Sequence, residues 1–162
     1  DHGLAILGQR REFNFQTDIK SDCAPLSQLV SDIKKVSGKI HALRDATRGG
    51  LATVLCEIAS RTSFDIDIFE ESIPVRRQTR GICEFLGMDP LYIANEGKMV
   101  IFAAKEDAAK IIRAMEKNKY GSGSAVIGKV STGRKGSVYL NTRIGTRRIV
   151  DIHYSEQLPR IC

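Results

Sequence analysis

The last residue of the chain is a cysteine, Cys162, which follows Pro159, Arg160 and Ile161. Chain termini fray unless they are tied down, so a thiol at this position can reach a partner protein and then return to a cleft of its own chain. The ten residues after Ile152 span at most about 35 Å when they are extended. Thiol reactivity depends on the microenvironment, so an inert exposed cysteine is the alternative. We therefore treat Cys162 as a candidate acceptor of a transferred group.

A second candidate is the segment Asp45-Ala46-Thr47-Arg48-Gly49-Gly50, which separates a predicted strand from a predicted helix. Glycines let a backbone approach a ligand closely, and the first amides of a helix favour an anion. The Thr47 hydroxyl can donate a hydrogen bond, and the Asp45 carboxylate is a hard oxygen ligand suited to Mg²⁺ that bridges phosphates. The segment matches neither the P-loop nor the dinucleotide fingerprint, and an ordinary glycine turn that caps a helix is the alternative. It indicates a phosphate site formed by Asp45, Thr47, Arg48, Gly49 and Gly50.

A third candidate is Glu96, in the segment Asn95-Glu96-Gly97-Lys98 that precedes a predicted buried strand. A carboxylate held on a loop at a strand edge can act as a general base if its surroundings tune its pKa. A solvated surface glutamate is the alternative.

The composition indicates one domain of an intracellular protein. The 162 residues suffice for a core without disulfide or metal support. No apolar run approaches the about 20 residues of a membrane helix, so no membrane insertion is predicted. The start, Asp1-His2-Gly3, is neither a start methionine nor a basic leader, and we expect a fragment of a longer protein. The four cysteines form no C-x-x-C pair, so zinc binding is not predicted and we expect a reducing, cytoplasmic compartment.

The positive charge of the chain does not by itself indicate nucleic-acid binding. The formal net charge is +6, with 25 lysines and arginines against 19 acidic residues. The basic residues are dispersed along the sequence, and aromatic residues make up only 6%, which is poor for base stacking. We therefore predict a solvated basic surface, and no nucleic-acid partner.

The spacing of apolar residues predicts the elements that must position these candidates. Helices are predicted over residues 26–36, from Gly49–Gly50 to about Ile58, from after Pro74 to Leu86, and over about 106–117. Strands are predicted over residues 40–43, 64–68, 98–104, 125–130, 137–141 and 147–152.

Helices that alternate with strands, followed by a terminal β meander, are typical of a layered α/β sandwich with a mixed sheet. Ser21 or Asp22 is predicted to cap the first of these helices. Cys56 and Cys83 are expected to be small buried residues on helices.

Eight segments along the chain carry a family resemblance. They are Asp1-His2-Gly3, Asp22-Cys23-Ala24-Pro25-Leu26, residues 44–51, Ile73-Pro74-Val75, Cys83-Glu84, residues 86–91, residues 94–98 and residues 159–162. Together they resemble the HypE family of hydrogenase maturation proteins, within the PurM-like (AIR synthase-related) superfamily. The Pro-Arg-Ile-Cys ending is specific to that family, whereas the Arg-Asp-x-Thr-Arg-Gly-Gly segment has counterparts across the superfamily. The resemblance covers essentially the whole chain and corresponds to the C-terminal domain of a two-domain protein.

The resemblance implies a division of the chain and a reaction. Residues 1–152 would form a PurM-like C-terminal domain, and residues 153–162 a flexible tail with the acceptor cysteine. The N-terminal ATP-binding domain would lie outside this chain. The reaction would be the ATP-dependent dehydration of an S-carboxamide on Cys162 to a thiocyanate, which supplies the cyanide ligands of the iron in NiFe hydrogenases.

The resemblance also implies cofactors, residue roles and partners. ATP and Mg²⁺ would be the cofactors, with Asp45 as a metal ligand and Glu96 as the base. The partners would be the carbamoyltransferase HypF, the HypC–HypD scaffold complex and a second copy of the full-length protein in a homodimer. The isolated domain would be inactive.

Other functions share part of this pattern. A selenophosphate synthetase-like or thiamine-phosphate kinase-like enzyme of the same superfamily would share the fold and the phosphate site, but would not need a C-terminal cysteine. A noncatalytic carrier or docking module, which only carries or docks a group, is the alternative from a different functional class.

Overall fold

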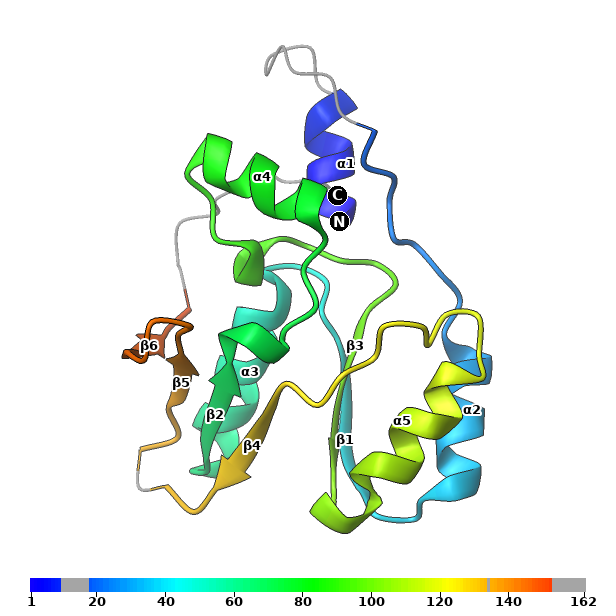
Figure 1. Ribbon diagram of the computed structural model, residues 1–162. Coiled ribbons are helices and arrows are strands. Elements are labelled where there is room, and N and C mark those ends of the chain that lie inside the picture. Colours follow the sequence, from blue (N-terminus) through cyan, green and yellow to red (C-terminus); the bar gives the residue numbers. More distant parts are fainter. Residues whose placement is uncertain (10–17, 134, 153–162) are drawn as a thin grey trace.

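The computed structural model describes residues 1–9, 18–133 and 135–152 (Figure 1). The α/β class with a mixed sheet is confirmed, and the predicted helices and strands occur within a few residues of their expected bounds. The helices are α1 (His2–Gln9), α2 (Ser27–Val36), α3 (Gly50–Thr62), α4 (Arg77–Leu86) and α5 (Ala108–Glu116). The strands are β1 (Ile40–Asp45), β2 (Asp65–Phe69), β3 (Met99–Ala103), β4 (Gly128–Ser131), β5 (Val138–Asn141) and β6 (Arg147–Val150).

The strands form two sheets. The larger sheet is mixed and has the order β4-β2-β5-β6, in which β2 and β5 run parallel and the other pairs are antiparallel. The predicted terminal meander is therefore wrong between β4 and β5, because β2 lies between them. Strand β2 alternates buried Ile66 and Ile68 with half-buried residues, which suits a central position. Strand β4 is largely exposed and carries Lys129, which suits a sheet edge.

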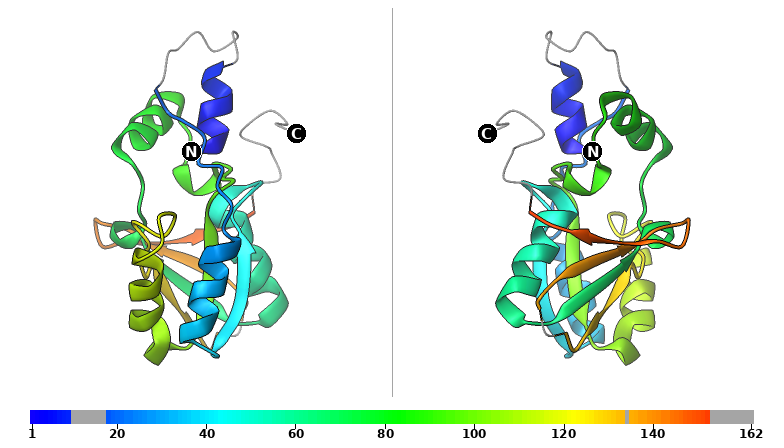
Figure 2. Two further views of the ribbon diagram at one scale, coloured as in Figure 1. Left: turned by 90° about the vertical axis from the view of Figure 1, so that its right-hand side faces the viewer. Right: turned by 90° about the vertical axis from the view of Figure 1, so that its left-hand side faces the viewer.

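The smaller sheet is the antiparallel pair of β1 and β3. Its side chains alternate between two cores, as the two-residue period of a strand requires. Val100 and Phe102 pack against the core beneath α3, whereas Ile101 and Ala103 pack against the core between α2 and α5. Helices α3 and α5 accordingly lie on opposite sides of the strands (Figure 2), which confirms the layered arrangement.

Helix α1 was not predicted from the sequence. Leu4 and Leu7 are one turn apart and almost fully buried, in a core shared with Cys83 of α4 and with Ile93. The Gly3 amide donates a hydrogen bond of 3.0 Å to the carbonyl oxygen of Ala94. Two glycines within eight residues weaken the helical signal in the sequence. The helix is instead stabilised by contacts with residues distant in sequence.

The predicted burial of two cysteines is confirmed. Cys56 on α3 and Cys83 on α4 are free and buried, whereas Cys23 is exposed. Among the residues that the structure describes, no helix has the length and apolar character needed to cross a membrane.

Candidate functional site

The β1–β3 ladder brings the two central candidate segments together. Asp45, the last residue of β1, lies opposite Met99, the first residue of β3. Beyond this pair, the Ala46 amide donates a 3.0 Å hydrogen bond to the Lys98 carbonyl oxygen, and the Asn95 amide donates a 3.0 Å bond to the Ala46 carbonyl oxygen. The turn after β1 and the loop before β3 therefore lie side by side, although about fifty residues separate them in sequence.

Three predicted site residues line one open pocket of about 330 Å³. Asp45 and Thr47 come from the turn after β1, and Glu96 comes from the loop before β3. The remaining wall is mostly apolar. It consists of Ala24, Leu26, Ser27, Val30 and Met99.

The two carboxylates of this pocket are available for chemistry. Asp45 and Glu96 are exposed, and neither carboxylate has a hydrogen-bond or ion-pair partner among the described residues. No group of three or more histidine, cysteine and acidic side chains within the described ranges could hold a metal ion. A single carboxylate such as Asp45 fits Mg²⁺ that takes its other ligands from phosphates and water. Glu96 lines the same pocket from the opposite segment.

The other predicted phosphate ligands lie beside the pocket rather than in its wall. Arg48 is exposed, and Gly49 and Gly50 have positive φ angles of 72° and 62°. Gly49 is the N-cap of α3, with no side-chain hydrogen bond to the first turn. Gly50 is buried, and a Cβ at this position would lie 2.5 Å from the Leu91 carbonyl oxygen. The missing side chain of Gly50 therefore makes room for the protein's own backbone.

Replacing Gly50 with alanine is expected to destabilise the protein by roughly 1–3 kcal/mol. The new Cβ would meet backbone carbonyl oxygens of Leu91 and Ile93, and an L-residue is strained at this φ. Urea denaturation measures the effect. Gly81→Ala is the matched control, because a Cβ there meets no atom within 4 Å and helix α4 should gain about 0.5–1 kcal/mol. Equal effects of the two substitutions would contradict this account.

Asn95 is a structural residue of the site that the sequence did not reveal. Its Nδ2 donates hydrogen bonds to the carbonyl oxygens of Ala46, at 3.2 Å, and of Ile93, at 2.9 Å. Its Oδ1 accepts a 3.1 Å bond from Lys98 Nζ. Asn95 thereby fastens the turn that carries Asp45 to the loop that carries Glu96. Only the fold brings these partners within reach.

The predicted helix cap at Ser21 or Asp22 is wrong. The N-cap of α2 is Leu26, with no side-chain hydrogen bond. The Asp22 carboxylate instead accepts bonds from the His2 amide, at 2.8 Å, and from Lys98 Nζ, at 2.9 Å. Asp22 lies four residues before Leu26, and the charged amine of Lys98 attracts its carboxylate more strongly than neutral helix amides would.

The surroundings of Asp22 lower its pKa. Burial alone would raise this pKa, but the hydrogen bond from Lys98 and the nearby positive charges outweigh burial and lower it to about 2. The folded state therefore favours the ionised carboxylate.

Ionised Asp22 is expected to stabilise the fold at neutral pH by about 2 kcal/mol. Its pKa in the folded protein is below its ordinary value of 3.8, so this contribution is complete above that value and is lost as the pH falls towards 2. Urea denaturation of the wild type and of Asp22→Asn at several pH values measures it. The difference in unfolding free energy should shrink in the acid range, and a constant difference would contradict the prediction.

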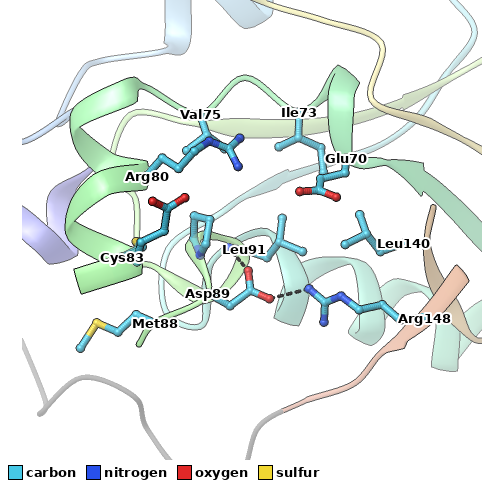
Figure 3. A pocket seen from close by; sticks show the side chains of 12 residues that line it. Glu70, Ile73, Val75, Arg80, Cys83, Met88, Asp89, Leu91, Leu140 and Arg148 are labelled. Atoms are coloured by element: carbon cyan, nitrogen blue, oxygen red, sulfur yellow. Dashed lines mark hydrogen bonds and ion pairs between the residues drawn. The ribbon is translucent and has the colours of Figure 1, made fainter. Parts of the chain in front are cut away.

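A second pocket, of about 300 Å³, contains none of the predicted site residues (Figure 3). Its charged side chains include Glu70, Arg80, Asp89 and Arg148. Asp89 pairs with Arg148 at 2.5 Å and also accepts a 2.9 Å bond from the Leu91 amide. The charge of Asp89 is thus already compensated, unlike those of Asp45 and Glu96.

Cys162 and the predicted tail, residues 153–162, lie outside the described residues. The chain that leads to them is anchored to the domain. Cys56 Sγ donates a 3.3 Å hydrogen bond to the Val150 carbonyl oxygen, and the Tyr92 hydroxyl donates a 2.7 Å bond to the Asp151 carbonyl oxygen.

Comparison with known proteins identifies the relatives of this chain. A carbamoyl dehydratase HypE from Rhodobacter capsulatus is 44% identical over all 162 residues, which correspond to 48% of that protein. The chain thus spans about half the length of the curated relatives that it matches.

Two solved structures are similar over most of the chain. A crystal structure of hydrogenase maturation protein HypE in complex with ATP has a TM-score of 0.91 and 42% identity, and covers 100% of this chain and 50% of its own. A crystal structure of a HypE–HypF complex has a TM-score of 0.88 and 41% identity, and covers 94% of this chain and 50% of its own. These comparisons confirm the resemblance to HypE proteins.

The family described as AIR synthase related protein, C-terminal domain, matches residues 1–141. The match includes both segments of the first pocket and all elements up to β5. The chain belongs to this family.

Proposed function

We propose that this chain is the C-terminal half of a HypE-type carbamoyl dehydratase. In this proposal a carbamoyl group is carried on the sulfur of Cys162, and ATP drives its dehydration to a thiocyanate. The product supplies cyanide for the iron of a NiFe hydrogenase. The observation that carries the proposal is the convergence of Asp45, Thr47 and Glu96 on one pocket in a domain of this family.

The chemistry explains why these groups are needed together. An amide oxygen is a poor leaving group, so it first attacks the γ-phosphorus of ATP and ADP leaves. The nitrogen then loses its two protons, one to the base and one to solvent, while the carbon–oxygen bond breaks, and phosphate departs with the oxygen. Each carboxamide and ATP thus give one thiocyanate, ADP and phosphate. The reaction requires charge compensation at the phosphates and a base beside the nitrogen.

The residues of this chain divide these tasks in the proposal. Asp45 would hold Mg²⁺, whose charge would neutralise the phosphates. The Thr47 hydroxyl and the Gly49 amide, just before α3, would contact phosphate oxygens. The Gly50 amide already donates a 3.0 Å hydrogen bond to the Thr47 carbonyl oxygen, so Gly50 would shape the turn. Glu96 would accept a proton from the carboxamide nitrogen. The exposed carboxylates of Asp45 and Glu96, which have no protein partners among the described residues, support this division.

Of the proposed partners, HypF has support from a solved structure of relatives. HypF would donate the carbamoyl group to Cys162, as the structure of a HypE–HypF complex supports. The HypC–HypD complex would receive the cyanide, and two copies of the full-length protein would form a homodimer. A cytoplasmic location would suit a free, reduced acceptor thiol.

We expect residues 1–162 alone to bind Mg-ATP weakly or not at all. The domain offers one glycine turn and one metal-binding carboxylate, which are too few contacts for the triphosphate, and the rest of the site would come from the other half. Titration calorimetry should give measurable heat for the full-length protein and none for residues 1–162. Micromolar affinity of residues 1–162 would contradict the proposed division of the ATP site.

A further inference from the structure

The Asp22 carboxylate is enclosed by the loop that carries Glu96. Its side chain is only 7% exposed. Oδ1 accepts hydrogen bonds from the amides of His2, at 2.8 Å, and Glu96, at 3.4 Å. Oδ2 accepts from the amide of Gly97, at 3.4 Å, and from Lys98 Nζ, at 2.9 Å. Three consecutive loop residues thus donate to one carboxylate.

The backbone of Asp22 restrains the same loop by close packing. A Cβ at Gly97 would overlap the main-chain carbonyl oxygen of Asp22 and lie 3.1 Å from the Cβ of Ala24. Only glycine therefore allows this approach. The loop contacts Asp22 through its backbone as well as through its carboxylate.

A chain of contacts extends from Asp22 to the other wall of the pocket. Lys98 Nζ, which binds Asp22, also donates to Asn95 Oδ1, and Asn95 Nδ2 donates to the Ala46 carbonyl oxygen. Ala46 lies between the pocket residues Asp45 and Thr47. Asp22 itself does not line the pocket.

We propose that Asp22 is a positioning residue for the dehydration, which holds the backbone of Glu96 so that the Glu96 carboxylate stays at the reacting carboxamide. The inference rests on the proposed function. In this proposal Asp22 acts by holding Glu96 in place and contacts neither ATP nor the carbamoyl group.

Replacement of Asp22 by asparagine tests the role of its negative charge with little change in size. The four groups that hydrogen-bond to the carboxylate are all donors, and the Asp1 nitrogen lies 3.6 Å from Oδ1. An amide NH₂ in place of one oxygen therefore leaves at least one donor without an acceptor. The loop should then shift, and a misplacement of about 1 Å can cost about 10²-fold in rate.

The experiment uses full-length protein whose Cys162 has been carbamoylated by HypF. In single turnovers, Asp22→Asn should slow the ATP-dependent dehydration by about 10²-fold and leave the KM for ATP unchanged. Asp32→Asn is the matched control, because Asp32 also pairs with a lysine, Lys35 at 3.1 Å, but does not line the pocket. Its other hydrogen-bond partners are Gln28 and Asn118, not residues of the loop that carries Glu96. This control should react at the wild-type rate.

A double-mutant cycle tests whether Asp22 acts through Glu96. In a Glu96→Gln background, Asp22→Asn should slow the reaction little further. The proposal would be overturned if the effects of the two substitutions multiplied in the double variant. It would also be overturned if Asp22→Asn reacted at the wild-type rate, or raised the KM for ATP without changing the rate. A wild-type protein that forms no thiocyanate would instead overturn the proposed function.

Hydrogen exchange supplies a test that does not depend on activity, and its wild-type measurement does not depend on the folding of a variant. In the wild type, the peptide with residues 94–98 should exchange its amides more slowly than an unstructured peptide. In Asp22→Asn, this peptide should exchange faster while the α5 peptide is unchanged. An unprotected 94–98 segment in the wild type would overturn the proposal.

Discussion

Glu96→Gln in the full-length protein is expected to slow thiocyanate formation by about 10²–10⁴-fold, the usual contribution of a positioned acid–base group. Glutamine keeps the size of the side chain and its hydrogen bonding, but cannot accept a proton at neutral pH. Carbamoylation of Cys162 should remain intact, because HypF performs that transfer. The masses of the carbamoyl and cyano adducts over time measure both steps.

A matched variant and two other outcomes make this test decisive. Glu106→Gln removes another exposed carboxylate, which pairs with Lys39 away from the pocket, and should leave both steps unchanged. A nearly normal rate of cyanation in Glu96→Gln would remove Glu96 from the mechanism. Loss of carbamoylation as well would show that Glu96 positions the tail or folds the loop.

Cys162→Ala is expected to abolish both adducts. Of the other three cysteines, Cys56 and Cys83 are poor competitors, because burial raises the pKa of each thiol to about 11 and leaves little thiolate at neutral pH. Cys23 is the exposed thiol among the described residues. Intact-mass analysis after incubation with HypF, carbamoyl phosphate and ATP measures the loss.

The matched control for this prediction is Cys23→Ala, which removes the exposed competitor and should leave both adducts at wild-type levels. Peptide mapping of the wild type, with a protease that cuts after glutamate, should place the modification on the peptide that contains Cys162. A modified Cys162→Ala protein would falsify the assignment of the acceptor.

The order of elements was predictable because most of them carry a clear local signal. Apolar spacing identified α2 to α5, and strict alternation identified β2, whose Ile66 and Ile68 are buried. Helix α1 escaped prediction because its stability comes from contacts of Leu4 and Leu7 with distant residues. The strand order was not predicted either. Strands that follow one another in sequence usually pair, but here β2 separates β4 from β5.

The candidate site was predictable in its residue types but not in its assembly. Asp45, Thr47 and Glu96 were identified separately, and the β1–β3 register brings them to one pocket. The functions of Asp22 and Gly50 depend on partners remote in sequence. A carboxylate before a helix is typical of a cap, and a glycine before a helix is typical of a ligand contact. In the structure, Asp22 instead binds Lys98, and Gly50 instead packs against the backbone of residues 91–93.

The most direct test of the account is the intact mass of the full-length wild-type protein in a stepwise reaction. Incubation with HypF, carbamoyl phosphate and ATP should first add one carbamoyl group to Cys162. The adduct should then lose the mass of one water, with one ADP formed for each thiocyanate. An adduct on another residue, or a carbamoyl adduct that persists with ATP and Mg²⁺, would contradict the account.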